Sequence, residues 1–189
     1  MKIAYIDTET TGLDAQRNGV VQLAAILERD GEVVDRINLD IAPMPGDIVE
    51  SEALAVSGKT SAEVYQYPSA SDAYRTLSRA LTAHVSKFDK YDKFFFLAYN
   101  APFDSGFVRR FFEKNGDKYY GSYFWHPPIC VMNMAAQKLA HRRADLPNFK
   151  LTTVAEAIGV ACEGNAHDAT YDITLTREVY KKLLEEGAR

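Results

Sequence analysis

The hydrophobic positions near the start of the chain have the spacing of β-strands. Residues Ile3 to Asp7 form a short apolar run that ends in an acidic residue, as a buried central strand does. Two β-rich stretches follow, Val20 to Leu27 and Val33 to Ile41, and Asp30-Gly31 between them is a strong hairpin signal. A further buried strand is predicted over Phe94 to Tyr99.

Helical spacing of apolar residues marks most of the remaining chain. Residues Ser69 to Phe88 repeat their apolar positions about once per helical turn. The predicted inner face of this helix consists of Tyr74, Leu77, Leu81 and Val85. Further helices are predicted over Phe103 to Phe112, Val131 to Ala140, Leu151 to Ile158 and Ala169 to Leu184. The aromatic, proline-containing stretch Tyr119 to Pro128 predicts an irregular segment.

Strands that alternate with helices predict an α/β fold with a mixed sheet and helices on its faces. The sequence has no internal repeat and no obvious interdomain linker, so residues 1–189 are expected to form a single domain. The composition of 47% hydrophobic and 25% charged residues is that of an ordinary globular protein.

Cysteine use and hydropathy bear on where the protein works. Cys130 and Cys162 lie far apart and form no CxxC pair, which argues against a structural zinc site and a disulfide framework. The N-terminus reaches an acidic residue after only four apolar positions, too few for a signal peptide. The sequence contains no run of about 18 apolar residues, the length that a membrane-spanning helix needs. These features predict a cytoplasmic protein without a membrane partner.

The net charge of −4 limits the kind of nucleic-acid partner. Proteins that bind long duplexes tightly are usually basic, because neutralised phosphates supply much of the affinity. An enzyme that holds only a strand end needs few such contacts, and bound divalent ions add positive charge of their own. The charge therefore argues against an extended duplex binder but not against an enzyme acting on strand ends.

Two acidic residues stand at the end of the first predicted strand. Asp7 and Glu9 are two positions apart, so strand geometry places both carboxylates on one face. Neighbouring carboxylates raise each other's pKa unless a cation lies between them, and Mg²⁺ prefers such oxygen ligands. The small and polar residues that follow, Thr10 to Leu13, would let the backbone approach a substrate closely. A solvated strand end is the simpler interpretation of an isolated pair of acids.

A third acid, Asp104, falls in the first turn of the helix predicted after Phe94 to Tyr99. One explanation is structural: Asn100 is a natural N-cap, Pro102 suits the first turn, and an acid favours the positive end of a helix. The other is functional, because α/β sheets gather their ligand-binding groups where strands end and helices begin.

Another polar cluster lies before the last predicted helix. His167 and Asp172 are five positions apart, so within one helix their side chains would diverge. They can converge if His167 lies on the preceding loop and Asp172 in the first helical turn, with Asp168 as N-cap. Taken singly, His167 is explained as a surface or capping residue and Asp172 as an acid that compensates the helix dipole.

Together, in this order, these motifs resemble the DEDDh exonuclease superfamily. That superfamily includes the proofreading exonuclease subunits of bacterial replicative polymerases, ribonuclease T and oligoribonucleases. The resemblance covers nearly the whole chain and rests on IDTETTGL at 6–13, ALAVSGKT at 53–60, YNAPFDSGF at 99–107 and HDATYD at 167–172. The sister branch would have Tyr at position 168, which is Asp here, so the motif indicates the histidine branch.

The resemblance implies a ribonuclease H-like fold, with a central mixed five-stranded sheet flanked by helices. It implies that two divalent ions, Mg²⁺ or Mn²⁺, act as cofactors and that His167 is the general base. The implied metal ligands are Asp7, Glu9, Asp104 and Asp172. The implied substrate contacts are Leu13 and Phe103, which would flank the terminal nucleotides, together with Thr10, Gly12 and Asn100.

The expected activity is metal-dependent 3′→5′ hydrolysis at the 3′ ends of single-stranded DNA, with a DNA polymerase as a candidate partner. An exoribonuclease acting on RNA ends or short oligoribonucleotides is the main alternative, because only a few contacts read the 2′-hydroxyl. A non-catalytic polymerase-binding or scaffold module and an enzyme for small nucleotides are further alternatives. A basic cluster, either a solvated face or a surface that steers phosphates, comprises Lys138, His141, Arg142 and Arg143.

Overall fold

The computed structural model describes residues 1–162 and 168–185. The strands are β1 (Lys2–Thr10), β2 (Val20–Arg29), β3 (Glu32–Asp40), β4 (Phe95–Ala98) and β5 (Ile129–Cys130). The helices are α1 (Ser51–Val56), α2 (Ser61–Val64), α3 (Ala70–His84), α4 (Ala101–Lys114), α5 (Val131–Lys138), α6 (Leu151–Ala157) and α7 (Ala169–Glu185). Two 3₁₀ turns, η1 (Tyr120–Ser122) and η2 (Ala140–Asp145), lie between helices and strands.

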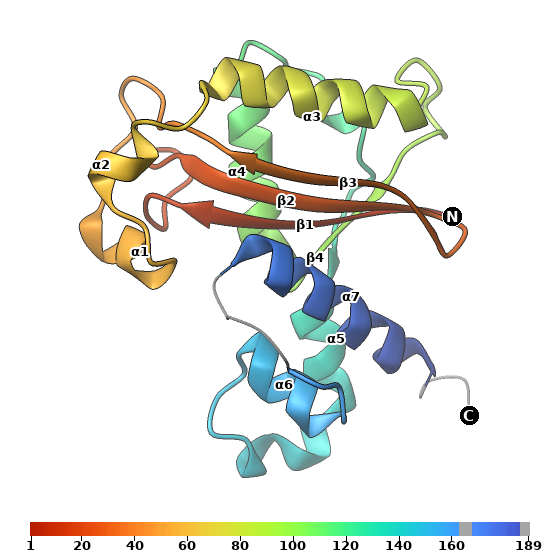
Figure 1. Cartoon of the computed structure of the whole chain (residues 1–189). Helices are drawn as coiled ribbons and strands as arrows, with labels where there is room; N and C mark the ends of the chain where they lie inside the picture. Colours follow the sequence, from red (N-terminus) through yellow and green to blue (C-terminus); the bar gives the residue numbers. More distant parts are fainter. Residues whose placement is uncertain (163–167, 186–189) are drawn as a thin grey trace.

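The five strands form one mixed sheet in the order β3-β2-β1-β4-β5. Strands β1, β2 and β3 are antiparallel neighbours, whereas β4 pairs in parallel with β1 and β5 in parallel with β4. The expected five-stranded mixed sheet flanked by helices is thus confirmed. In Figure 1, α3 and α4 lie on one side of the sheet and α5, α6 and α7 on the other.

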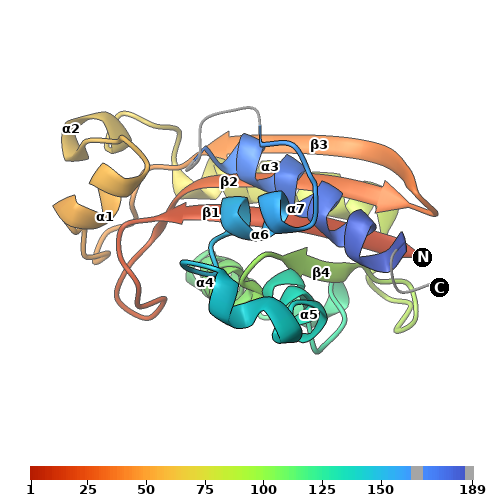
Figure 2. The same cartoon turned by 90° about the horizontal axis from the view of Figure 1, so that it is seen from below.

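The central strand β1 is buried on both faces, and its alternation decides which helix each side chain meets. Ala4 and Ile6 belong to the core beneath α3 and α4, while Ile3 and Tyr5 belong to the core beneath α5, α6 and α7. Figure 2 shows α6 and α7 lying across the sheet on this second face. Continued along the strand, the alternation directs odd-numbered residues towards α7 and even-numbered residues towards α4.

The two parallel strands beside β1 are short, and this leaves one end of β1 open. The β1–β4 register runs from Ile3 opposite Phe95 to Tyr5 opposite Leu97 and stops there. Beyond Tyr5, β1 continues to Thr10 with β2 as its neighbour on one side. The backbone of the acidic end of β1 is therefore free to interact with the start of α4.

Several predicted elements match the structure closely. The hairpin turn has positive φ at both central residues, 52° at Asp30 and 91° at Gly31, as a type I′ turn requires. The third helix is shorter than predicted: it ends at His84, and Phe88 is 95% exposed. Helices α1 and α2 and the two-residue strand β5 were not predicted, because elements this short contain too few residues to show a period.

A buried ion pair fastens α7 to the sheet. Arg177 donates from Nε and from its terminal nitrogen to Glu28 Oε2 on β2, at 2.8 and 2.7 Å. The side chains of Arg177 and Glu28 are only 14% and 6% exposed, and Tyr5 also donates to Glu28 at 3.4 Å. This contact fixes the helix that carries Asp172.

In the described part of the chain, no helix is both long enough and apolar enough to cross a membrane.

Candidate active site

Three of the predicted acidic residues meet at the open end of β1. Carboxylate oxygens of Asp7, Glu9 and Asp172 all lie within 4.8 Å of one another. Asp7 and Glu9 are odd-numbered residues of β1 and therefore face α7, whose first turn carries Asp172. That turn is capped as predicted, because Asp168 Oδ1 accepts from the backbone N–H groups of Thr170 and Tyr171 at 2.9 and 3.1 Å.

Asp104 approaches the same place from the other side of the sheet. It is 4% exposed, and its Oδ1 accepts from the Thr8 backbone N–H at 3.0 Å and from the Thr8 hydroxyl at 2.8 Å. Thr8 is even-numbered and faces α4, and its N–H is available because β4 has already ended. Thr8 was not predicted as a site residue, although its position between two acids on an alternating strand was a usable signal.

The electrostatics of this cluster are unfavourable without a cation. Burial, followed by the charges of Asp104 and Glu9, raises the pKa of Asp7 well above its ordinary value. Burial also raises the pKa of Glu9 to about 7, although nearby Lys59 opposes the shift. The pKa of Asp104 rises to about 7, mainly through burial, despite its hydrogen bonds from Thr8. Four acids held in so small a volume fit a site for divalent cations.

An open pocket of about 390 Å³ lies over the acidic cluster. This volume suits a ligand of nucleotide size. Besides the four acids, the lining residues are Thr8, Tyr99, Asn100, Phe103, Met132, Phe149, Lys150 and Leu151. The contributions of Tyr99, Met132 and residues 149–151 were not predicted, because no local pattern distinguishes them from core or loop.

The structure places Asn100 and Phe103 in the wall of this pocket. Asn100 occupies the N-cap position of α4 as predicted, but in the described part of the chain its side chain makes no capping hydrogen bond. Phe103 is partly buried and packs on Phe107, with ring centroids 4.8 Å apart. Both side chains are thus available to a ligand in the pocket.

The other predicted substrate contacts lie on the loop after β1. Thr10 is buried, and its hydroxyl donates to the Gly12 carbonyl at 2.7 Å, a contact that shapes the loop. Leu13 is 83% exposed. Asn18 holds the loop from beneath by donating to the carbonyls of Thr11 and Ile48 at 3.3 and 2.9 Å.

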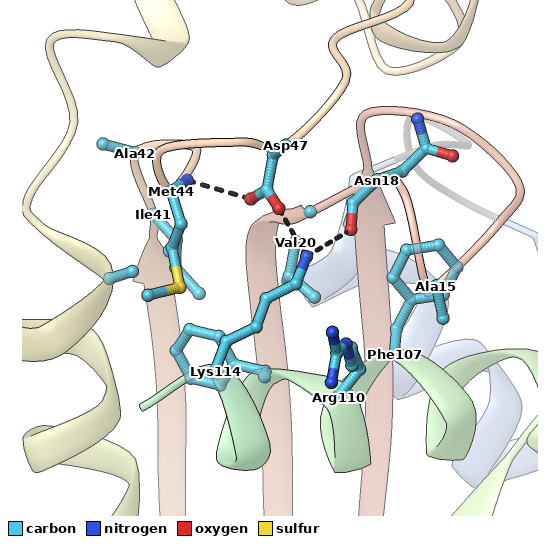
Figure 3. Close-up of a pocket in the computed structure, with 13 residues that line it drawn as sticks. Ala15, Asn18, Val20, Ile41, Ala42, Met44, Asp47, Phe107, Arg110 and Lys114 are labelled. Atoms are coloured by element: carbon cyan, nitrogen blue, oxygen red, sulfur yellow. Dashed lines mark hydrogen bonds and ion pairs between the residues drawn. The ribbon is translucent and has the colours of Figure 1, made fainter. Parts of the chain in front are cut away.

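Helix α4 anchors the same loop. Figure 3 shows Lys114 reaching from α4 to Asp47 and to the Asn18 carbonyl, which it meets at 2.9 Å. The space among these residues amounts to about 10 Å³, the size of a single water molecule. This small cavity therefore serves the packing of the loop and is too small for a nucleotide.

The tight fit at Gly12 gives a prediction about stability. A Cβ at this position would lie 2.6 Å from Asn18 Oδ1, so Gly12→Ala must displace Asn18 and its hydrogen bonds. We expect Gly12→Ala to lower the free energy of unfolding by about 1–3 kcal/mol in a urea titration. Gly106→Ala is the control, because its Cβ would meet nothing within 4 Å. Equal stability of the two variants would contradict the packing described here.

Two further predictions concern His167 and the basic cluster. His167, the predicted general base, lies outside the described residues. Within the basic cluster, Arg143 stacks over the Phe149 ring at 5.2 Å, whereas Arg142 donates to the Ala157 carbonyl at 3.2 Å. Since Phe149 lines the pocket, Arg143 lies beside it, and its effect on phosphates stays a prediction.

Comparison with known proteins gives a consistent result. The RNase_T family model, described as exonuclease, matches residues 4–180. The DNA polymerase III epsilon subunit of Aquifex aeolicus is 26% identical over 184 residues, which cover 96% of this chain and 79% of that protein. The PolC-type DNA polymerase III of Bacillus cereus is 24% identical over 180 residues, or 95% of this chain and 11% of that protein.

Among solved structures, the fold is similar to that of E. coli exonuclease I in its zinc-bound complex with single-stranded DNA. The TM-score is 0.79 at 22% identity, and the match covers 100% of this chain and 41% of that one. The likeness confirms the expected fold, and this chain corresponds to less than half of that protein. Given the family match and the acids gathered at the end of β1, the chain belongs to the RNase_T exonuclease family, within the DEDD exonuclease superfamily.

Proposed function

We propose that the chain forms a single metal-dependent exonuclease domain that removes nucleotides from the 3′ end of single-stranded DNA. The observation that carries the proposal is the meeting of Asp7, Glu9 and Asp172 within 4.8 Å, beside Asp104, in an open pocket of nucleotide size. The epsilon-subunit relative and the exonuclease I complex with single-stranded DNA support DNA as the polymer. The products would be nucleoside 5′-monophosphates.

The acidic cluster fits two divalent ions, Mg²⁺ or Mn²⁺. Asp7, Glu9 and Asp172 would hold them together with Asp104, because these carboxylates are close together and line one pocket. When bound, such ions activate a water molecule and neutralise charge that develops on the phosphate and the leaving oxygen. Carboxylate oxygens are the ligands that these hard cations prefer.

The protein's own groups position the substrate and move the proton. Thr8 holds Asp104 in one orientation through two hydrogen bonds. Phe103 offers a ring on which a base can stack regardless of sequence, and the exposed Leu13 can separate the last nucleotides. His167 would take the proton from the attacking water, since the ordinary pKa of histidine, about 6.5, suits this role at neutral pH.

A time course on 5′-labelled single-stranded DNA and RNA oligonucleotides tests this function. With Mg²⁺ we expect a DNA ladder that shortens from the 3′ end and disappears with EDTA, because the acids cannot act without the cation. Glu185→Gln, which removes an exposed acid at the far end of α7, should leave the ladder unchanged.

The same experiment separates the alternatives. Faster shortening of RNA than of DNA would favour the exoribonuclease, and internal cuts would contradict an enzyme that acts on ends. Absence of metal-dependent cleavage of either polymer would leave a scaffold module or an enzyme for small nucleotides. A candidate DNA polymerase partner follows from the epsilon-subunit and PolC relatives, and co-purification with a polymerase subunit would test it.

A further inference from the structure

A second groove lies on the other side of the first turns of α4. Its volume is about 330 Å³, close to that of the pocket over the acids. Its α4 wall is a stripe of residues spaced three and four apart, Pro102, Ser105, Gly106 and Arg109. Tyr120 and His126, from the segment between α4 and β5, form part of the opposite wall.

Gly106 in the middle of α4 is unexplained by packing. A glycine inside a helix costs about 1 kcal/mol relative to alanine, so its presence usually reflects a close neighbour or a special backbone angle. A Cβ at Gly106 would meet nothing within 4 Å, and its φ is not in the positive range. What the glycine does provide is open space along the floor of the groove.

The charge of the groove differs from that of the whole molecule. Although the chain has a net charge of −4, none of the described residues that line the groove is Asp or Glu. Arg109 is exposed and stacks on the Tyr120 ring, with its guanidinium carbon 4.5 Å from the ring centroid. Its neighbour Arg110 pairs with Glu113 at 3.0 Å, so that acid is already engaged.

Arg109 is in a suitable state to bind an anion. Within residues 1–162 and 168–185, its guanidinium takes part in no hydrogen bond or ion pair. The stacking on Tyr120 holds the planar group in place while leaving its N–H donors available. Such a preorganised guanidinium binds phosphate oxygens well, and the exposed His126 offers a second donor in the same groove.

The groove and the active-site pocket lie on either side of the first turn of α4. Pro102 lines the groove, while the next two residues, Phe103 and Asp104, line the pocket over the acids. A strand with its 3′-terminal phosphodiester at the acidic cluster would therefore need to cross only the first turn of α4 to reach the groove.

We infer that this groove binds the part of a single-stranded nucleic acid that lies on the 5′ side of the cleaved nucleotide. Arg109 and His126 would contact a phosphate, and the space before Gly106 would take a sugar or base. The inference rests on the proposed function and assigns to it a second substrate-binding surface. It also gives an acidic protein a groove for the strand that contains Arg109 and, among its described lining residues, no Asp or Glu.

Substrates of two lengths test this inference. For an oligonucleotide of about 12 residues, Arg109→Glu should raise KM about tenfold with little change in kcat, because one charged phosphate contact is lost. Hydrolysis of a dinucleotide, too short to reach the groove, should be unchanged. Gly106→Leu should likewise raise KM for the long substrate by filling the groove, while its melting temperature stays at or above that of the wild type.

The matched control is Arg79→Glu, an exposed arginine on α3, which lies over β3 at the opposite edge of the sheet from β5. It removes the same charge from another surface and should affect neither substrate. Equal effects of Arg109→Glu on long and short substrates, or no effect on either, would overturn the inference.

A binding measurement separates this inference from the proposed function. Fluorescence anisotropy of a labelled oligonucleotide of about 12 residues, in EDTA, reports affinity without hydrolysis. Wild-type binding that Arg109→Glu weakens about tenfold would support the groove even if no cleavage were found. Normal 3′-end cleavage by the wild type, with binding unaffected by Arg109→Glu, would overturn the groove and leave the proposed function in place.

Discussion

Asp7→Asn should abolish hydrolysis and, at the same time, raise the melting temperature of the metal-free protein at pH 8. The rate should fall by at least about 10³-fold, because one carboxylate of the proposed cation site is lost while the shape of the side chain is kept. The stability should increase because Asp7 is partly buried beside Asp104, Glu9 and Asp172, whose charges repel its own.

The pH dependence of stability follows from the same cluster. The pKa values of Glu9 and Asp104 rise from ordinary values of 4.5 and 3.8 to about 7 in the folded protein. Groups with raised pKa values favour the folded state fully below about pH 4, and this contribution is lost as the pH rises towards 7. Metal-free wild type should therefore melt at a lower temperature at pH 8 than at pH 5, with a smaller difference in Asp7→Asn.

Differential scanning fluorimetry at both pH values, with EDTA and with Mg²⁺, measures these effects beside the exonuclease assay. Mg²⁺ should stabilise the wild type more at pH 8 than at pH 5, because cations bind the ionised carboxylates. Glu185→Gln is the control for loss of an acid elsewhere on the surface. A fall in the melting temperature of metal-free Asp7→Asn at pH 8 would contradict the repulsive cluster.

Arg177→Met should be the most destabilising single substitution proposed here. It leaves Glu28 buried and charged, and among the described residues the side-chain partners that remain are Tyr5 at 3.4 Å and Lys181 at 3.9 Å. Removal of one member of a buried ion pair costs about 3–5 kcal/mol. Because the pair fastens α7 to β2, the acidic cluster should lose Asp172 as the helix loosens, and activity should fall at lower temperatures than in the wild type.

Denaturant titrations of two further variants test whether the loss of stability comes from the Arg177–Glu28 ion pair. Lys181→Met removes a weaker contact from a side chain that is 37% exposed, and should cost less than about 1 kcal/mol. The double variant Arg177→Met with Glu28→Leu removes both charges and should recover most of the lost stability. A cost of Arg177→Met no greater than that of Lys181→Met would show that the pair does not hold the helix.

The sequence predicted the parts of the site that depend on local rules. Alternation along a strand placed Asp7 and Glu9 on one face, and a capping residue at Asp168 placed Asp172 in the first turn of a helix. The hairpin at Asp30-Gly31 follows from the φ angles that these residues tolerate. Each of these features depends on residues that are close together in the chain.

The features that the sequence did not predict depend on tertiary packing. Thr8 contacts Asp104 only because β4 ends early and lets the start of α4 approach β1. Asn100 is a residue type that favours N-cap positions, and it occupies one. Its side chain nevertheless lines the pocket and makes no capping hydrogen bond within the described chain. The groove beside Gly106 forms between α4 and the segment that leads to β5, and no local sequence pattern predicts that these two segments pack together. His167, whose role comes from the motif alone, stays a prediction.

The dispersal of the four acids along the chain has a consequence for biosynthesis. Asp7 lies on the first strand and Asp104 on α4, whereas Asp172 arrives with α7, the last helix of the described chain. A nascent chain that has emerged from the ribosome only as far as α6 contains all five strands but lacks this acid. Cleavage would therefore begin only after α7 has been synthesised and has docked. Truncated translation products that end before α7 would then be inert.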